Sequence, residues 1–253
     1  MRKKTLVTVL LTVILFISAC VLTVATVYRV SAVTLEISVV SEAAKGEAEE
    51  LEKAIAAKYK KESIFSVTKR AAKKEFERYP HLRMTGFEKS YPNRLIVKGI
   101  EDPEVYAVEK ENGYYILGGD GTVLCERETP LNRSDGKNNV VLKGVTVSCG
   151  KGEIPTDSDF TTAFALCKAL DERLDGIRAN ILTATLEKPT SKPEDAILRL
   201  FSKEGVEMVV YHPLQNATLK ADALAEYYKN MNTVDRLSGT VFVSDDGKCS
   251  YEP

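Results

Sequence analysis

The chain has 253 residues, of which 35 are Lys or Arg and 36 are Asp or Glu, and its formal net charge at pH 7 is −1. The two signs are interspersed, so the sequence offers no basic surface for a polyanion and nucleic acid is not an expected partner. Five cysteines have a spacing that fits neither a zinc site nor a tight disulfide framework, which favours single buried thiols over paired cystines.

The first 28 residues predict a membrane anchor. Arg2, Lys3 and Lys4 precede an uncharged, mostly apolar run over residues 5–28. This run is longer than the roughly 20 residues that a helix needs to cross a bilayer. Because basic residues are retained on the cytoplasmic side, residues 1–4 are expected to form a cytoplasmic tail. The bulk of the chain is then expected outside the cell membrane, in a single-pass type II topology.

Two other interpretations of the apolar run compete with an uncleaved anchor. A cleaved secretory signal would have a small-residue cleavage site at Ser31-Ala32, but the apolar stretch is long for such a signal. Ile17-Ser18-Ala19-Cys20 is similar to a bacterial lipobox with Cys20 as the lipidated residue, although residues 21–27 stay apolar where lipoproteins turn polar. The uncleaved anchor is favoured, and the alternative is a lipid-anchored extracytoplasmic binding protein of unknown ligand.

Residues 34–101 predict a small domain with the order strand, helix, helix, strand, strand. Alternation of apolar and polar residues indicates strands, and apolar residues at helical spacing indicate helices. Ser66 is the expected N-cap of the second helix, and Pro80 is expected to end it. The predicted elements are a strand at 35–39, helices at 46–59 and 66–79, and strands at 82–89 and 94–101.

Residues 102–253 predict a β-rich domain that ends in a hairpin, so the fold class is α+β. Polar turn-forming residues at 128–138 are typical of a linker. The predicted strands lie at 105–109, 114–117, 122–126, 140–147, 179–186, 196–201 and 206–211. Two helices are predicted at 157–174 and 219–231, and the hairpin strands at 239–244 and 248–251.

No set of residues in the sequence points to catalysis or to a metal or cofactor. His81 and His212 lack a nearby nucleophile or a second histidine at ligand spacing. The paired carboxylates Asp157/Asp159 and Asp245/Asp246 have structural explanations, the first as helix caps and the second as turn residues. The sequence thus predicts a non-catalytic protein without a cofactor, metal or small-molecule substrate. An extracytoplasmic hydrolase assembled from distant residues is the third alternative.

Four stretches are similar to the sequence pattern of one bacterial family. They are Ile64-Phe65-Ser66-Val67, the segment from Tyr79-Pro80 through Phe87 and Tyr91-Pro92-Asn93 to Val97, Glu101-Asp102-Pro103-Glu104-Val105, and Asp120-Gly121-Thr122-Val123-Leu124. With the strand-helix-helix-strand-strand order directly after a membrane anchor, residues 34–101 resemble a POTRA domain. Together with the β-rich domain, the chain resembles the FtsQ/DivIB family of bacterial cell-division proteins. The resemblance is good over 60–125, and beyond 140 it lies in the order of elements.

This resemblance implies a scaffold of the divisome at the division septum, linked to septal wall synthesis. Its expected partners are small coiled-coil division proteins of the FtsB/DivIC and FtsL types. The last strand, Lys248, Cys249, Ser250 and Tyr251, is expected to accept a partner strand at a sheet edge, with the Ser250 backbone donor exposed and Tyr251 as an anchor. A second edge is expected at Arg94, Leu95, Ile96 and Val97. The competing interpretation is that residues 248–251 only complete the sheet, with Lys248 protecting the edge.

Overall fold

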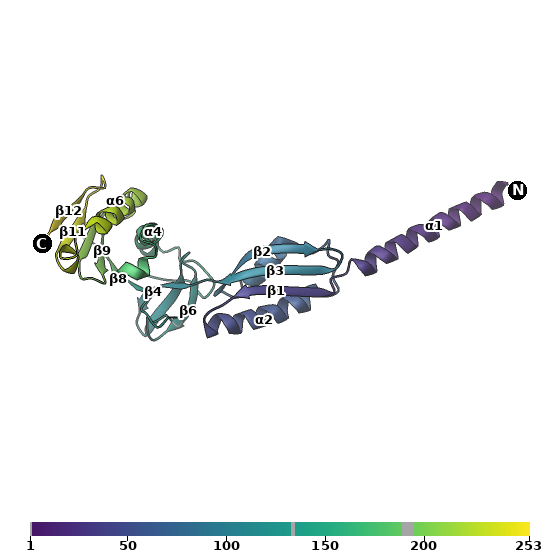
Figure 1. Cartoon of the computed structure of the whole chain (residues 1–253), viewed down its shortest axis with the longest axis horizontal. Coiled ribbons are helices and arrows are strands. Elements are labelled where there is room, and N and C mark those ends of the chain that lie inside the picture. Colours follow the sequence, from purple (N-terminus) through teal and green to yellow (C-terminus); the bar gives the residue numbers. More distant parts are fainter. Residues whose placement is uncertain (1, 133–134, 189–194) are drawn as a thin grey trace. The chain divides into compact units, whose positions relative to one another are not determined.

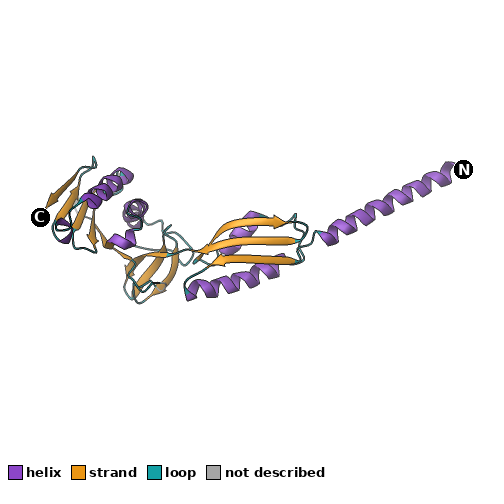
Figure 2. Cartoon of the chain, in the orientation of Figure 1, coloured by secondary structure: helices purple, strands orange, loops and turns teal. Residues whose placement is uncertain are grey.

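The protein contains an apolar N-terminal helix and a large β-rich sheet, which confirms the expected mixture of helices and strands (Figures 1 and 2). The computed structural model describes residues 2–132, 135–188 and 195–253. Met1 of the predicted cytoplasmic tail and residues 133–134 of the predicted linker lie outside the described residues. The chain divides into two compact units, Met1–Glu101 and Asp102–Pro253, which we describe in turn.

The N-terminal helix α1 spans Arg2–Val27. Its segment Leu10–Val27 has a mean hydropathy of 2.6 and none of it is buried, so α1 is long and apolar enough to cross a membrane. The hydroxyl groups of Thr23 and Thr26 donate to the helix carbonyls of Ala19 and Leu22 at 2.8 and 2.9 Å. These polar groups are therefore satisfied within the helix itself, as an apolar surrounding requires.

The remainder of the first unit has the element order that its sequence predicts. The elements are β1 (Ala32–Ser38), α2 (Glu42–Tyr59), α3 (Lys69–Phe76), β2 (Leu82–Ser90) and β3 (Arg94–Glu101). The three strands form one sheet in the order β1-β3-β2, with α2 packed beside it (Figure 1). β3 is the central strand, because it pairs in parallel with β1 and antiparallel with β2.

The expectation that Arg94, Leu95, Ile96 and Val97 lie at a sheet edge is therefore wrong. The backbone of these residues is paired on both sides, with Ala32–Leu35 of β1 and with residues 87–90 of β2. The side chains of Leu95 and Val97 are fully buried in the core of the first unit. An alternating apolar pattern gives the same signal for a central strand as for an edge strand, so the sequence did not distinguish the two.

Helices α2 and α3 each begin at a capping side chain. The Ser41 hydroxyl accepts a hydrogen bond from the Ala44 amide, so that α2 starts at Glu42 rather than at the predicted Gly46. The Thr68 hydroxyl accepts from the Ala71 amide at 3.2 Å, which corrects the predicted N-cap at Ser66. Ser66 instead donates to the Ser63 carbonyl within the preceding turn.

We expect Thr68→Ala to lower the stability of the first unit by about 1 kcal/mol, because it leaves a helix N-terminal amide without its side-chain acceptor. The matched control is Ser66→Ala, which removes an exposed hydroxyl two residues earlier and is expected to have a much smaller effect. Hydrogen exchange of the amides of α3 measures the stability change caused by each of the two substitutions. Equal effects of the two substitutions would contradict the assignment of the cap to Thr68.

The second unit is built on a nine-stranded sheet in the order β12-β11-β10-β9-β8-β7-β4-β5-β6. Its strands are β4 (Glu104–Lys110), β5 (Gly113–Gly118), β6 (Val123–Arg127), β7 (Val140–Lys143), β8 (Ile181–Glu187), β9 (Ile197–Ser202), β10 (Glu207–Tyr211), β11 (Thr240–Val243) and β12 (Cys249–Glu252). Its helices are α4 (Ser158–Arg173), α5 (Ile177–Asn180), α6 (Ala217–Asn230) and a short 3-10 turn, η2 (Asp235–Leu237).

Three pairings in this sheet are parallel, namely β4 with β7, β7 with β8, and β10 with β11. The others are antiparallel. α4 and α6 pack against each other and contribute apolar side chains, among them Phe160 and Leu224, to the core that includes the inner side chains of the strands.

Three local predictions for the second unit need correction. The strand predicted at 140–147 ends at Lys143, because the next residue, Gly144, has a φ of +70°, which interrupts the extended backbone. Residues 179–180, predicted as the start of a strand, belong instead to the short helix α5. Asp157 precedes α4 without a side-chain capping bond, and its carboxylate accepts from the amide and hydroxyl of Ser148.

Candidate functional site

The C-terminal strand β12 forms one edge of the nine-stranded sheet. It pairs antiparallel with β11 in the register Val243↔Cys249 to Thr240↔Glu252, and it is the terminal strand in the sheet order. Figure 1 shows β12 and β11 beside α6 at the C-terminal end of the chain. Of the predicted site residues, Cys249, Ser250 and Tyr251 lie in the strand, and Lys248 lies in the turn that leads into it. The predicted position at a sheet edge is thus observed for Cys249, Ser250 and Tyr251.

The direction of each backbone group of β12 follows from the hairpin turn. The Ser244 amide donates to the Lys248 carbonyl at 3.0 Å, and the Gly247 amide donates to the Ser244 carbonyl at 3.0 Å. Ser244 and Lys248 are therefore a hydrogen-bonded pair, and such pairs alternate along an antiparallel ladder. It follows that Ser250 bonds to Phe242 of β11, whereas the N–H and C=O groups of Cys249 and Tyr251 point outward.

This geometry corrects the expectation for Ser250. Its amide is directed toward β11 and stabilises the hairpin, so it is not a donor for an added strand. Cys249 and Tyr251 supply the outward donors and acceptors instead. Their spacing of two residues is the spacing at which an added β-strand places its own complementary groups.

The side chains of β12 alternate between a partly buried and an exposed face. Cys249 and Tyr251 pack against the core, whereas Ser250 and Glu252 are exposed. The Tyr251 hydroxyl donates to the Ser238 carbonyl at 3.1 Å, and its ring lies over Gly239, where a Cβ would come 2.7 Å from ring atom Cε2. Tyr251 is thus engaged within its own unit, and the outer face at this edge carries Ser250, Glu252 and, one strand inward, Phe242.

The other end of the same sheet is partly covered. Strand β6 is the terminal strand there, but the amide of Val123 donates to the Glu153 carbonyl at 2.9 Å. The carbonyl of Val123 accepts from the Gly152 amide at 2.8 Å. The segment after β7 therefore occupies the start of this edge, whereas among the described residues no backbone hydrogen bond of this kind covers the outward groups of β12.

A charge network centred on the buried Lys220 connects the hairpin that carries β12 to the rest of the unit. The side chain of Lys220 on α6 is fully buried, and its ammonium donates to the carbonyls of Tyr211 and His212 at 2.6 and 2.9 Å and to Asp245 Oδ1 at 2.8 Å. Asp245 lies in the turn between β11 and β12, so Lys220 ties this turn to the end of β10. The network thus links the turn of the edge hairpin to α6 and to the end of β10.

His212 joins the same network, which the sequence did not predict. Its Nδ1 atom lies 2.8 Å from Asp245 Oδ2, and its Nε2 atom lies 3.4 Å from Asp195 Oδ1. Hydrogen bonding to Lys220 is the main cause that lowers the pKa of Asp245, and hydrogen bonding to Asp245 is the main cause that raises the pKa of His212 above 6.5. The partners are 17 and 33 residues away from His212 in sequence, so no local motif could have revealed them.

The stability of the second unit is expected to fall as the pH rises above about 6.5. Because the folded-state pKa of His212 is raised, its contribution is fully present below the unfolded value and is lost as the pH passes through the folded value. Chemical unfolding followed across this range measures the effect. In His212→Asn this dependence should flatten, since Asn tolerates the left-handed φ of +44° at this position but does not titrate. An unchanged slope in the variant would assign the dependence to another group.

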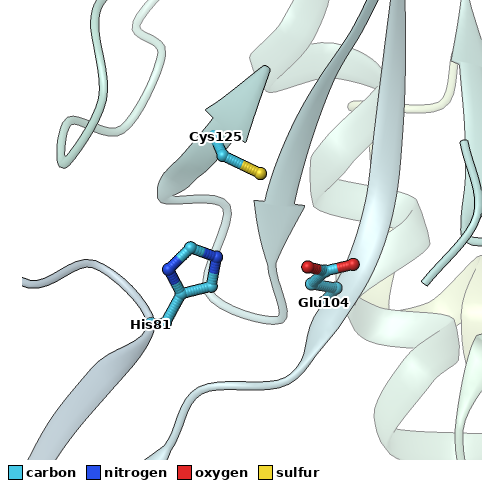
Figure 3. A group of neighbouring side chains, drawn as sticks. All are labelled: His81, Glu104 and Cys125. Carbon is cyan, nitrogen blue, oxygen red and sulfur yellow. The ribbon is translucent and has the colours of Figure 1, made fainter. Parts of the chain in front are cut away.

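Other polar residues also have defined positions within their own units. In the first unit, His81 precedes β2, and its Nδ1 atom and amide lie 3.0 Å from the two carboxylate oxygens of Glu47, a partner that the sequence did not predict. In the second unit, Glu104 at the start of β4 forms a buried ion pair with Arg127, and Cys125 lies on β6. Figure 3 draws His81, Glu104 and Cys125 as sticks.

All five cysteines are free thiols. Cys167 on α4 is fully buried, and burial raises the pKa of its thiol to about 12. Such a thiol carries almost no thiolate at neutral pH and is therefore unreactive. Cys20 lies within α1, where its side chain is exposed.

In comparisons with known proteins, no protein-family model matches the chain, and no curated protein matches it.

Proposed function

We propose that the chain is a single-pass, non-catalytic scaffold of the bacterial division apparatus, of the FtsQ/DivIB type. In this proposal α1 anchors the protein in the cell membrane with its short N-terminal tail in the cytoplasm. Residues 34–101 form a POTRA domain, and residues 102–253 carry the site for small division proteins of the FtsB/DivIC and FtsL types. The protein acts at the septum by linking these partners to wall synthesis.

The open edge of β12 is the observation that carries the proposal. An unpaired strand edge is a template for β-augmentation, in which main-chain hydrogen bonds supply affinity. The outward groups of Cys249 and Tyr251 meet this requirement, and the Lys220–Asp245 network keeps the hairpin rigid, so that little ordering is needed on binding. An added strand would also place its side chains beside Ser250 and Phe242 on the exposed face.

Two further observations support the family and the topology. After α1, the first unit has the strand-helix-helix-strand-strand order expected of a POTRA domain, and α1 has the length and hydropathy of a membrane span. The position of β3 inside its sheet changes where a second partner would bind in this unit. A partner strand could pair there with β1 or β2, which are the terminal strands of the three-stranded sheet.

The test is a titration of the full-length chain in lipid nanodiscs with the extracellular segment of a DivIC-like protein from the same organism. Saturable binding is expected, together with protection of the Cys249 and Tyr251 amides from hydrogen exchange. Absence of binding by a folded chain would overturn the proposed partner. The intact mass of the mature protein distinguishes an uncleaved transmembrane anchor from a lipid anchor. Acylation at Cys20 with loss of residues 1–19 would show the lipoprotein alternative instead.

A further inference from the structure

Three aromatic side chains form a cluster directly after α1. The rings of Tyr28 and Phe65 have centroids 5.1 Å apart, those of Phe65 and Tyr91 are 5.8 Å apart, and those of Tyr28 and Tyr91 are 6.4 Å apart. Tyr28 follows the last residue of α1, Phe65 lies in the loop between α2 and α3, and Tyr91 lies in the turn between β2 and β3. Three separate segments of the first unit thus meet at the end of the apolar helix.

Backbone hydrogen bonds fix this meeting point. The Tyr28 amide donates to the Val24 carbonyl at 3.1 Å, so that helical geometry continues into the cluster. The Tyr28 carbonyl then accepts from the Ile64 amide at 2.9 Å, and the Val30 amide donates to the Glu62 carbonyl at 2.8 Å. The Ser31 amide donates to the Asn93 carbonyl at 2.9 Å. The residues directly after α1 are therefore hydrogen-bonded to the two loops that carry Phe65 and Tyr91.

The two loop rings are more exposed than side chains of a core. Phe65 is 55% exposed and Tyr91 is 58% exposed, although the unit has a buried apolar core available. Lys89 borders them, since its Nζ donates to the Phe65 carbonyl at 3.5 Å, and Arg29 and Lys61 lie on the two backbone segments joined next to the cluster. Exposed aromatic rings with basic residues nearby match the boundary between acyl chains and lipid headgroups.

We propose that Tyr28, Phe65 and Tyr91 form a membrane-docking surface that inserts into the headgroup boundary of the bilayer that α1 spans. This inference rests on the membrane span of the proposed function. Because α1 runs directly into the cluster, the surface that these rings contact is the bilayer that α1 spans. A helix end at Val27 places Tyr28 at the edge of the hydrocarbon, and the hydrogen-bonded loops keep Phe65 and Tyr91 at the same depth. The rings, together with α1, then hold the first unit in one orientation on the membrane.

The chain contains no tryptophan, so single introduced tryptophans report depth directly. The full-length chain is reconstituted into vesicles of phosphatidylethanolamine and phosphatidylglycerol that carry brominated acyl chains, which quench nearby indole fluorescence. Phe65→Trp is the probe of the docking surface. Val40→Trp, at an exposed position two residues after the end of β1, is the matched control in the same unit, and Phe16→Trp in α1 reports insertion of the helix.

The proposal predicts that Phe65→Trp is blue-shifted and loses most of its emission with lipids brominated near the headgroup. Phe16→Trp should respond most to bromine near the chain end, and Val40→Trp should respond to neither. Quenching of Phe16→Trp without quenching of Phe65→Trp would overturn the docking surface and leave the membrane span intact. Quenching of neither would overturn the span, and the docking surface with it.

Discussion

Cys249→Pro is expected to weaken binding of the strand-forming partner by about 2 kcal/mol, or roughly 30-fold in Kd, because it deletes an outward N–H group of β12 and leaves the partner's acceptor unmatched. Proline is tolerated at a sheet edge when its nitrogen faces away from the neighbouring strand, so the hairpin itself should persist. Calorimetric titration of the nanodisc-embedded protein measures the affinity, and thermal unfolding checks the fold.

Two matched variants make this result specific. Cys249→Ala removes the same side chain but retains the amide, and it should bind nearly as the original chain does. Ser250→Pro removes the amide that pairs with Phe242, so it should lower the stability of the hairpin even without a partner. If Ser250→Pro left the hairpin unchanged, or if Cys249→Pro bound normally, the direction of the backbone groups or strand addition at this edge would be wrong.

Asp245→Ala is expected to cost the second unit about 3 kcal/mol of unfolding free energy. It leaves the ammonium of Lys220 buried with only two carbonyl acceptors, and an uncompensated buried charge is among the most costly changes to a folded protein. Hydrogen exchange of the amides of Thr240–Val243 locates the effect. The loss should concentrate in this hairpin, because Asp245 connects its turn to α6.

The double variant with Lys220→Met separates the charge effect from a general loss of contacts. Methionine retains an apolar chain of similar length, so removal of both charges should cost less than Asp245→Ala alone, and the two changes should be strongly non-additive. Additive losses would show that the Lys220–Asp245 pair contributes little and that the hairpin is held by packing alone.

The position of the last strand could be predicted from the sequence. Which of its backbone N–H and C=O groups face β11 and which point outward could not. The alternation around Tyr251 and the turn residues Asp245-Asp246-Gly247 are local signals, and they placed the hairpin within one or two residues. Which amides of β12 point outward depends on whether Ser244 and Lys248 form a hydrogen-bonded pair. That depends on the exact turn, and a shift of one residue reverses every group.

The order of the strands in the sheets could not be predicted from the sequence for a different reason. β3 lies between β1 and β2, and β4 pairs in parallel with β7, although β5 and β6 lie between these two strands in the sequence. Periodicity reports which face of a strand is buried but carries no information about its neighbour. The sequence did not predict the Lys220–Asp245–His212 network for the same reason. Its members lie on α6, in the last turn and after β10, and they meet only in the folded chain.

The outward groups of β12 belong to the main chain, and this determines which experiments can detect a partner there. An alanine scan alters side chains and leaves every N–H and C=O in place, and at Tyr251 it would report the lost contact with Ser238 before any contact with a partner. Such a scan would therefore score β12 as silent or as merely structural. Proline substitution, or replacement of single amides by esters, alters the groups that an added strand would use, and is the appropriate way to map this edge.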